Sequence, residues 1–335
     1  MYGINRHMIH PVTVFGSALD NCLVSSDEER EAVSAMLWAH KSPAPPFWES
    51  GVGKEIFIST NRARIRVLNF SCRSSCNARA VVFVPGFGAT PPGFQDFYEV
   101  LREKAELYYL ETREKPSSRI LDPRADMSVG QSVDDIRRAL SLLGLSDRGR
   151  DFVLVAPCWG ATIVLEGMIR GAISAPTILL ADPMHTLWFP KWVLRFVSPL
   201  LPVAIVRALR PVIARAMIGG MKEPAQKLRA SAFVCSADVW KWKKSAEAAR
   251  DFELFGRLGA ISRDVFVLNG TSDRIHDPRY YPRMAGEMPR GRFIHMPTEE
   301  NNRERLFGVA ALEFARVSET EGMPPSLMRF EKRIR

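Results

Sequence analysis

The stretch that decides the fold reads Asp151-Phe-Val-Leu-Val-Ala-Pro-Cys158-Trp-Gly-Ala-Thr-Ile-Val-Leu-Glu-Gly167. Its first half is an apolar run of strand length, its second half suits a helix, and Cys158 stands at the change. Small residues, Ala156 and Gly160, lie two positions to either side of the cysteine. Such residues permit a sharp strand-to-helix turn that exposes a nucleophile. We therefore predict that Cys158 is a nucleophile; the alternative is a buried structural cysteine.

Strands and helices alternate around this stretch. Apolar runs of strand length are expected at 80–84, 107–110, 176–181, 264–268 and 292–296, with helices between them. Such alternation predicts an α/β fold, in which a mostly parallel, twisted sheet carries helices on both faces. Two alternating segments, 55–60 and 63–70, come first and indicate an antiparallel hairpin at the sheet edge.

The alternation stops at residues 184–258, where prolines interrupt helical segments rich in Trp, Leu, Val and Arg. We expect a helical cap inserted between two strands of one sheet. The predicted organisation is an N-terminal extension around one helix at 1–50, an α/β core at 51–183 and 259–317, the cap at 184–258, and a mobile basic tail at 318–335.

The composition limits the partners. The chain has 335 residues, 46% of them hydrophobic, and a net charge of +9, which favours anionic ligands or surfaces without specifying a fold. No basic patch interleaved with aromatic residues indicates a nucleic-acid module, so we expect no nucleic-acid partner. No apolar run reaches the ~20 residues of a membrane span.

The cysteines indicate a reducing compartment. Their number, five, is odd, and no CxxC spacing predicts a disulfide framework or a zinc site. The N-terminus has no charged start followed by a long apolar core, so we expect no signal peptide. We therefore expect a cytoplasmic protein with no metal and no cofactor; the oligomeric state stays unknown.

The order of elements resembles the α/β-hydrolase fold superfamily from about residue 54 to 317. The features that carry the resemblance are the edge hairpin, the turn Pro85-Gly-Phe-Gly88, the cysteine turn, the cap and two final strands with acidic loops. The turn at Cys158 is similar to those of dienelactone hydrolases and polyhydroxyalkanoate synthases. The resemblance implies an esterase, thioesterase or acyltransferase acting on a small-molecule ester or thioester with a hydrophobic acyl group. It also implies an oxyanion hole formed by the backbone amides of Phe87 and Trp159.

The resemblance implies a catalytic acid as well. Asp273 follows the next-to-last strand directly, where the family usually places its acid. Asp182, after an earlier strand, is the alternative, and Asp277 is a third, weaker choice.

The base departs from the family pattern, because Glu300 occupies the expected histidine position. A carboxylate beside a thiol disfavours the thiolate, whereas an imidazolium favours it. We expect His295, on the last strand, to replace the missing base, with His276 and His185 as alternatives. The competing interpretation is a catalytically impaired member of the fold that binds a hydrophobic ligand or a partner.

Two cap segments, 187–197 and 203–215, place Lys or Arg among large apolar residues at near-helical spacing. Such segments can contact an anionic membrane peripherally or roof an acyl pocket. The alternative is that they pack an apolar face on the core while the basic side chains reach water.

Overall fold

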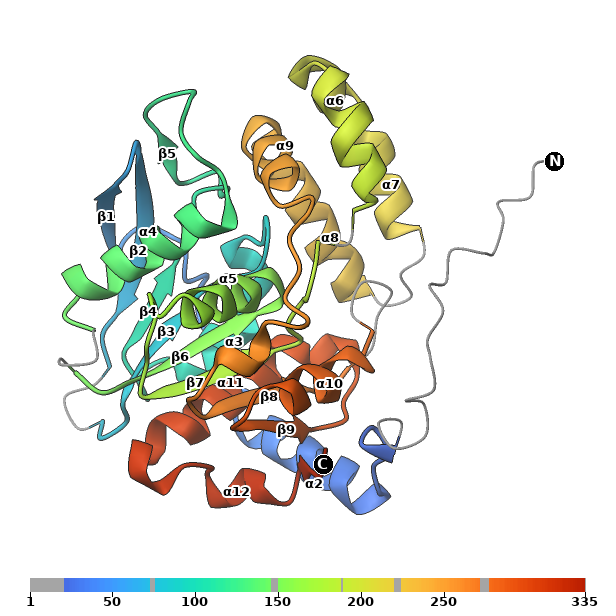
Figure 1. Cartoon of the computed structure of the whole chain (residues 1–335). Helices are drawn as coiled ribbons and strands as arrows, with labels where there is room; N and C mark the ends of the chain where they lie inside the picture. Colours follow the sequence, from blue (N-terminus) through green and yellow to red (C-terminus); the bar gives the residue numbers. More distant parts are fainter. Residues whose placement is uncertain are drawn as a thin grey trace.

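One sheet organises the molecule (Figure 1). The computed structural model describes residues 21–72, 76–145, 150–187, 189–219, 224–271 and 277–334. Within these residues the strand order is β1-β2-β4-β3-β6-β7-β8-β9-β10, and β5 pairs with β2. The strands are β1 (Lys54–Thr60), β2 (Ala63–Phe70), β3 (Ala80–Phe83), β4 (Leu107–Leu110), β5 (Arg119–Ile120), β6 (Phe152–Pro157), β7 (Thr177–Ala181), β8 (Val265–Asn269), β9 (Gly291–His295) and β10 (Glu331–Lys332).

The pairing confirms the α/β prediction. Strands β4, β3, β6, β7, β8 and β9 run parallel, whereas β1 and β2 form the antiparallel hairpin expected at one edge. The carboxyl ends of these parallel strands therefore lie side by side, and the loops that follow them can form a site.

Helices cover both faces because neighbouring side chains of each strand point to opposite sides. In β3, Val82 packs in the core beneath α4, α5 and α10, while Val81 and Phe83 pack beneath α2, α3 and α11. The helices are α2 (Asp27–Ala39), α3 (Gln95–Leu101), α4 (Val129–Leu142), α5 (Cys158–Ile169), α10 (Tyr280–Glu287), α11 (Arg303–Arg316) and α12 (Pro325–Met328).

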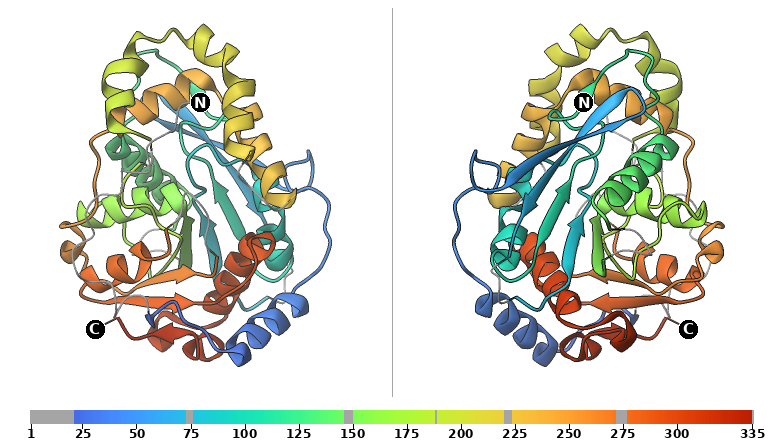
Figure 2. Two further views of the ribbon diagram at one scale, coloured as in Figure 1. Left: turned by 90° about the vertical axis from the view of Figure 1, so that its right-hand side faces the viewer. Right: turned by 90° about the vertical axis from the view of Figure 1, so that its left-hand side faces the viewer.

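The predicted cap is a helical region over 193–248. It comprises η2 (Val193–Val197), η3 (Ser198–Leu200), α6 (Val203–Ala208), α7 (Arg210–Ile218), α8 (Pro224–Ser236) and α9 (Val239–Ala248). Figure 2 shows α6 and α7 as its outermost elements. None of the described helices is both long enough and apolar enough to cross a membrane.

The C-terminal segment differs from the mobile basic tail expected at 318–335. Phe330 is completely buried, and β10 pairs antiparallel with β9. Arg329 and Lys332 form ion pairs with Glu28 and Glu29 of α2. These acidic partners lie about 300 residues away in sequence. Together with the burial of Phe330, they make the basic segment part of the fold.

Candidate active site

Cys158 occupies a strained turn between β6 and α5. Its φ is +52°, a left-handed value that is uncommon outside glycine and unfavourable for an ordinary side chain. A Cβ on Gly160 would lie 2.1 Å from the Val84 carbonyl oxygen, and one on Gly86 would lie 3.1 Å from Cβ of Cys158. The small residues therefore let the turn and the loop after β3 approach each other. The predicted sharp turn is confirmed, while the role of Cys158 as nucleophile stays a prediction.

The loop after β3 carries the predicted oxyanion donor, Phe87. Its ring lies 6.5 Å from the Trp159 ring and 5.5 Å from the Trp242 ring of α9, measured between centroids. Gly88 has φ +62°, and a Cβ there would lie 2.2 Å from the Trp242 side chain. The cap thus packs directly on this loop.

A buried lysine that the sequence analysis missed sets the orientation of this loop. Lys115 is completely buried, and its ammonium group donates a hydrogen bond to the Gly86 carbonyl. The C=O of Gly86 and the N–H of Phe87 belong to one trans peptide group and point in opposite directions. Holding the Gly86 oxygen on Lys115 therefore aims the Phe87 amide away from Lys115.

Lys115 belongs to a buried polar network. Its ammonium lies 2.9 Å from Oε1 of Glu114, and Nζ of Lys241 donates to the backbone oxygens of Lys115 and Ser118 at 2.9 and 2.6 Å. Burial raises the pKa of Glu114, but the Lys115 charge and the Lys115 and Thr112 hydrogen bonds outweigh it and hold the pKa below its ordinary value. The sequence signal was a charged run directly after a short apolar strand.

The Cys158 thiol contacts a methionine. Its Sγ lies 3.2 Å from Sδ of Met184, and Thr162 donates a 2.6 Å hydrogen bond to the Met184 carbonyl. Among the described residues, no histidine forms a hydrogen bond with Cys158.

Asp182, the alternative acid, is held in a buried ion pair. It is 1% exposed and has φ +47°. Asn269 donates to its Oδ1 at 2.7 Å, and the Arg303 guanidinium lies 2.8 Å from its Oδ2. Arg303 begins α11, three residues after Glu300. The resemblance placed the catalytic histidine in the loop before α11. The structure instead pairs Arg303, at the start of that helix, with the Asp182 carboxylate.

His185, an alternative base, has a carboxylate partner. Its Nδ1 lies 2.8 Å from Oε1 of Glu253, and its ring lies 4.6 Å from the rings of both Phe255 and Tyr280. Burial raises the pKa of Glu253, but the hydrogen bonds from His185 and two backbone amides hold it below its ordinary value. Glu253 was missed because it lies 68 residues away in sequence.

His295 lies apart from the thiol. Its strand, β9, is three strands from β6, which is about 14 Å at ordinary strand spacing. Burial and the charge of Lys332, opposed by Glu29, lower the pKa of His295 to about 4. The structure thus places a neutral imidazole among α2 and β10 and does not bring it to Cys158.

Asp273 and His276 lie outside the described residues, and the side chain of Glu300 is likewise undescribed.

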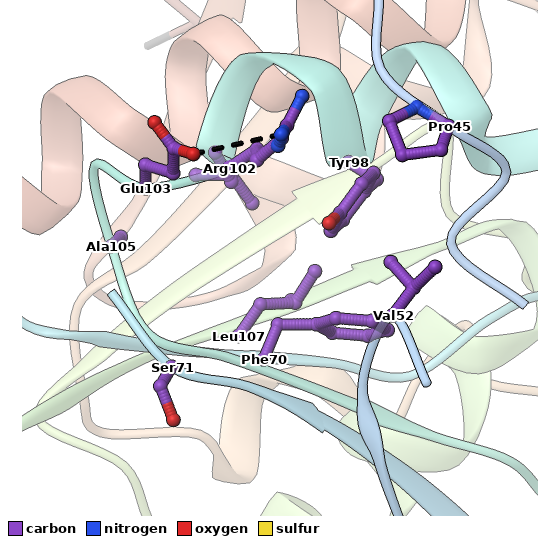
Figure 3. A pocket seen from close by; sticks show the side chains of 10 residues that line it. Pro45, Val52, Phe70, Ser71, Tyr98, Arg102, Glu103, Ala105 and Leu107 are labelled. Atoms are coloured by element: carbon purple, nitrogen blue, oxygen red, sulfur yellow. Dashed lines mark ion pairs between the residues drawn. The ribbon is translucent and has the colours of Figure 1, made fainter. Parts of the chain in front are cut away.

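A cavity of about 330 Å³ lies at the other end of the sheet (Figure 3). It is lined by the end of β2, the end of α3 and Leu107 at the start of β4, so it opens at the amino ends of the parallel strands. Val52, Phe70 and Tyr98 give it apolar walls, and Arg102 and Glu103 form an ion pair at its side. It is therefore separate from the Cys158 site.

Within the described ranges no three His, Cys, Asp or Glu side chains gather to hold a metal ion.

The parallel sheet, the strained turn and the helical cap define an α/β-hydrolase architecture. The sequence profile of the alpha/beta hydrolase family matches residues 81–308, and the chain belongs to that family. No curated protein matches the sequence.

Several solved structures share the fold. An esterase from Thermogutta terrifontis is 19% identical, with a TM-score of 0.59, and the match covers 73% of this chain and 90% of the esterase. The enol-lactonase from Burkholderia xenovorans LB400 is 16% identical, with a TM-score of 0.62 over 77% of this chain and 99% of its own. A hydrolase from Pseudomonas aeruginosa PA01 is 15% identical, with a TM-score of 0.61 over 79% and 99%. At these identities the likeness concerns the fold.

Proposed function

We propose that this chain is a hydrolase or acyltransferase that cleaves an ester or thioester through Cys158. The observation that carries the proposal is the positive φ of Cys158 at the junction of β6 and α5, packed against Gly86 and Gly160. A strained conformation persists only where the surrounding structure supports it, and such strain gathers at functional sites. The names of two structural neighbours, an esterase and an enol-lactonase, agree with ester chemistry.

The proposed first step is acylation of the thiol. The Cys158 thiolate attacks the carbonyl carbon, a C–S bond forms, and the carbonyl oxygen takes the negative charge. The Phe87 and Trp159 amides donate hydrogen bonds to that oxygen, and one such donor can contribute ~3 kcal/mol. The bond to the alcohol or thiol then breaks, and the leaving group takes the proton that Cys158 gave to the base. Water, or a second alcohol or amine, attacks the thioester carbonyl, the C–S bond breaks, and the acid, ester or amide leaves while the nucleophile's proton returns to the Cys158 sulfur.

The proton of Cys158 requires an acceptor. We propose that the acceptor is one of two histidines. His276 would be oriented by Asp273, whereas His185 has the carboxylate of Glu253 as its partner. The low pKa and remote strand of His295 make it the weakest of the three histidines. Single His→Asn substitutions at these positions identify the base. The acylation rate should fall about 10²-fold or more only in the variant that removes the base.

The test of the nucleophile is mass-spectrometric detection of acylation by a 4-nitrophenyl ester. Wild-type protein should carry the acyl group on the Cys158 peptide, and Cys158→Ala should lose it. Cys235→Ala is the matched control because it removes an exposed thiol outside the site. Equal acylation of wild type and Cys158→Ala would remove the proposed mechanism.

A second candidate is a member of the fold that binds a hydrophobic ligand or a partner without turnover. The Arg303–Asp182 pair and the Met184 contact with the thiol favour it, since both occupy groups that a triad would use. Glu300→His separates the candidates. Gained esterase activity would indicate a site that lacks only its base, whereas inactive wild type and inactive variant would favour the binding protein.

A further inference from the structure

The cap exposes a concentrated group of large apolar side chains. Seventeen such side chains are exposed in the described part of the chain, and nine of them lie between residues 192 and 228. We call the six most exposed of the nine the cap surface: Trp192, Phe196, Leu200, Ile205, Val212 and Leu228. Scattered exposed apolar side chains are normal, but neighbouring ones indicate a contact surface. These side chains lie on or beside elements that contact one another, η2 with η3, α6 with α7, and α7 with α8.

Three elements that carry half of this surface, η3, α6 and α7, bury none of their described side chains. In α6 and η3 no residue is buried, and no described side chain between 195 and 219 is buried. Helices as short as α6 and α7 depend on packing of an apolar face for their stability. Leu200 is nevertheless 81% exposed and Val212 64% exposed. These outermost helices, seen in Figure 2, therefore present an apolar face that the other described residues leave uncovered.

The charge of the same segment is predominantly positive. Between Pro183 and Ala237 eight Lys and Arg residues oppose a single Glu, which gives +7 of the net +9 of the chain. Lys191, Arg207 and Arg215 are exposed and form no ion pair with an acid among the described residues. The segment therefore offers free cationic groups beside the apolar ones.

The polar side chains of this segment match a lipid surface better than a protein surface as its partner. Ser198 is the single Ser, Thr, Asn or Gln residue between positions 187 and 218. Most of the other polar side chains of this segment are Lys and Arg, which donate hydrogen bonds and accept none, so they suit a partner surface made of acceptor oxygens such as lipid phosphates. Apolar side chains with interspersed Lys and Arg match acyl chains beneath anionic headgroups.

We propose that the cap surface docks the protein on an anionic lipid bilayer. The six apolar side chains enter the boundary between headgroups and acyl chains, and Lys191, Arg207 and Arg215 lie beside lipid phosphates. The contact is peripheral and is independent of whether Cys158 is a nucleophile.

The test is flotation of the full-length protein with vesicles. Vesicles with about one third phosphatidylglycerol in phosphatidylcholine should carry the protein upward, and pure phosphatidylcholine should carry much less. Binding should fall between about 0.05 M and 0.5 M NaCl, because salt screens the charges. Wild type that stays at the bottom with anionic vesicles at low salt would overturn the proposal.

Two double variants test the apolar side chains and the cationic side chains in turn. Leu200→Glu combined with Val212→Glu should reduce the partition coefficient about tenfold or more, and Arg207→Gln combined with Arg215→Gln should reduce it about thirtyfold. Leu142→Glu, on α4, is the matched control, because Leu142 is 62% exposed and lies outside the cap. Equal losses in all three variants would contradict a specific surface. Circular dichroism checks that each variant is folded.

Sedimentation velocity without lipid tests the competing occupant. The proposal predicts that wild type and Leu200→Glu/Val212→Glu have the same oligomeric state. If wild type self-associates, the variant disperses it and neither binds vesicles, the cap surface joins two copies of the chain and the lipid proposal fails.

Discussion

The guanidinium of Arg303 lies 2.8 Å from Oδ2 of Asp182, a carboxylate that is almost completely buried. The pair joins the loop after β7 to the first turn of α11, and Asn269 supports the second carboxylate oxygen. It therefore ties the loop after β7 to the start of α11 at the carboxyl ends of the parallel strands, where Cys158 lies.

Loss of Arg303 should leave a buried, uncompensated charge. Removing one partner of a buried ion pair typically costs ~3–5 kcal/mol, and we expect the lower value for Arg303→Met because Arg303 is partly exposed. Asp182→Asn combined with Arg303→Met should cost less than the sum of the single changes. Urea unfolding of the four proteins measures the coupling. Arg316→Met, which breaks a surface pair with Glu313, is the control and should cost at most about 1 kcal/mol.

Lys115 should act as a positioning residue for the Phe87 amide. In Lys115→Met combined with Glu114→Gln, the buried charges are removed together and the Gly86 carbonyl loses its donor. If the chain is active, kcat for the ester should fall about 10²-fold with KM nearly unchanged, since an oxyanion contact forms in the transition state. Glu114→Gln alone leaves the Lys115 charge without its carboxylate but keeps the hydrogen bond to Gly86, so it should retain more activity than the double variant. A loss confined to KM would contradict the positioning role.

Gly160 should tolerate no side chain. A Cβ there meets the backbone oxygen of Val84 at 2.1 Å. Val84 directly follows β3 and its amide donates a 2.9 Å hydrogen bond to the Val155 carbonyl, so this backbone cannot move aside cheaply. Gly160→Ala should therefore lower the free energy of unfolding by about 3 kcal/mol, at the upper end for overpacking. Gly93→Ala is the control because nothing lies within 4 Å of its added Cβ, and it should change stability by less than about 0.5 kcal/mol.

His295 should make stability depend on pH. Burial first, then the charge of Lys332, lowers the folded-state pKa to about 4, whereas an unfolded histidine titrates near 6.5. The unfolded chain therefore binds the proton first, and stability should fall as pH drops from about 6.5 through 4, by roughly 3 kcal/mol in total. His295→Phe should flatten this part of the curve in urea titrations. A wild-type profile identical to that of His295→Phe would contradict the pKa shift.

The turn at Cys158 could be predicted from sequence because its determinants are local. A strand-length apolar run, two small residues and a helix occupy neighbouring positions, and the structure confirms the turn they predict. The hairpin of β1 and β2 was predictable for the same reason, since alternation and a short polar gap are contained within one segment.

The partners of the site could not be predicted this way. Lys115, Glu253 and Arg303 carry no periodic signal, and each gains its place from contacts made 29 or more residues away. The two-residue strand β10 is too short to show alternation, so its basic residues suggested a mobile tail. Ion pairs with α2 and burial of Phe330, both set by the tertiary structure, decided otherwise.

The short strand β10 also determines how this molecule ends its sheet. Without it, β9 would present unpaired backbone groups to solvent, and an open strand edge invites a second chain to add to it. A two-residue strand that carries Lys332 offers little backbone and one positive charge, which discourages such addition. Proteolysis or a fusion joint near Phe330 would reopen that edge, so a purification tag placed directly there invites aggregation.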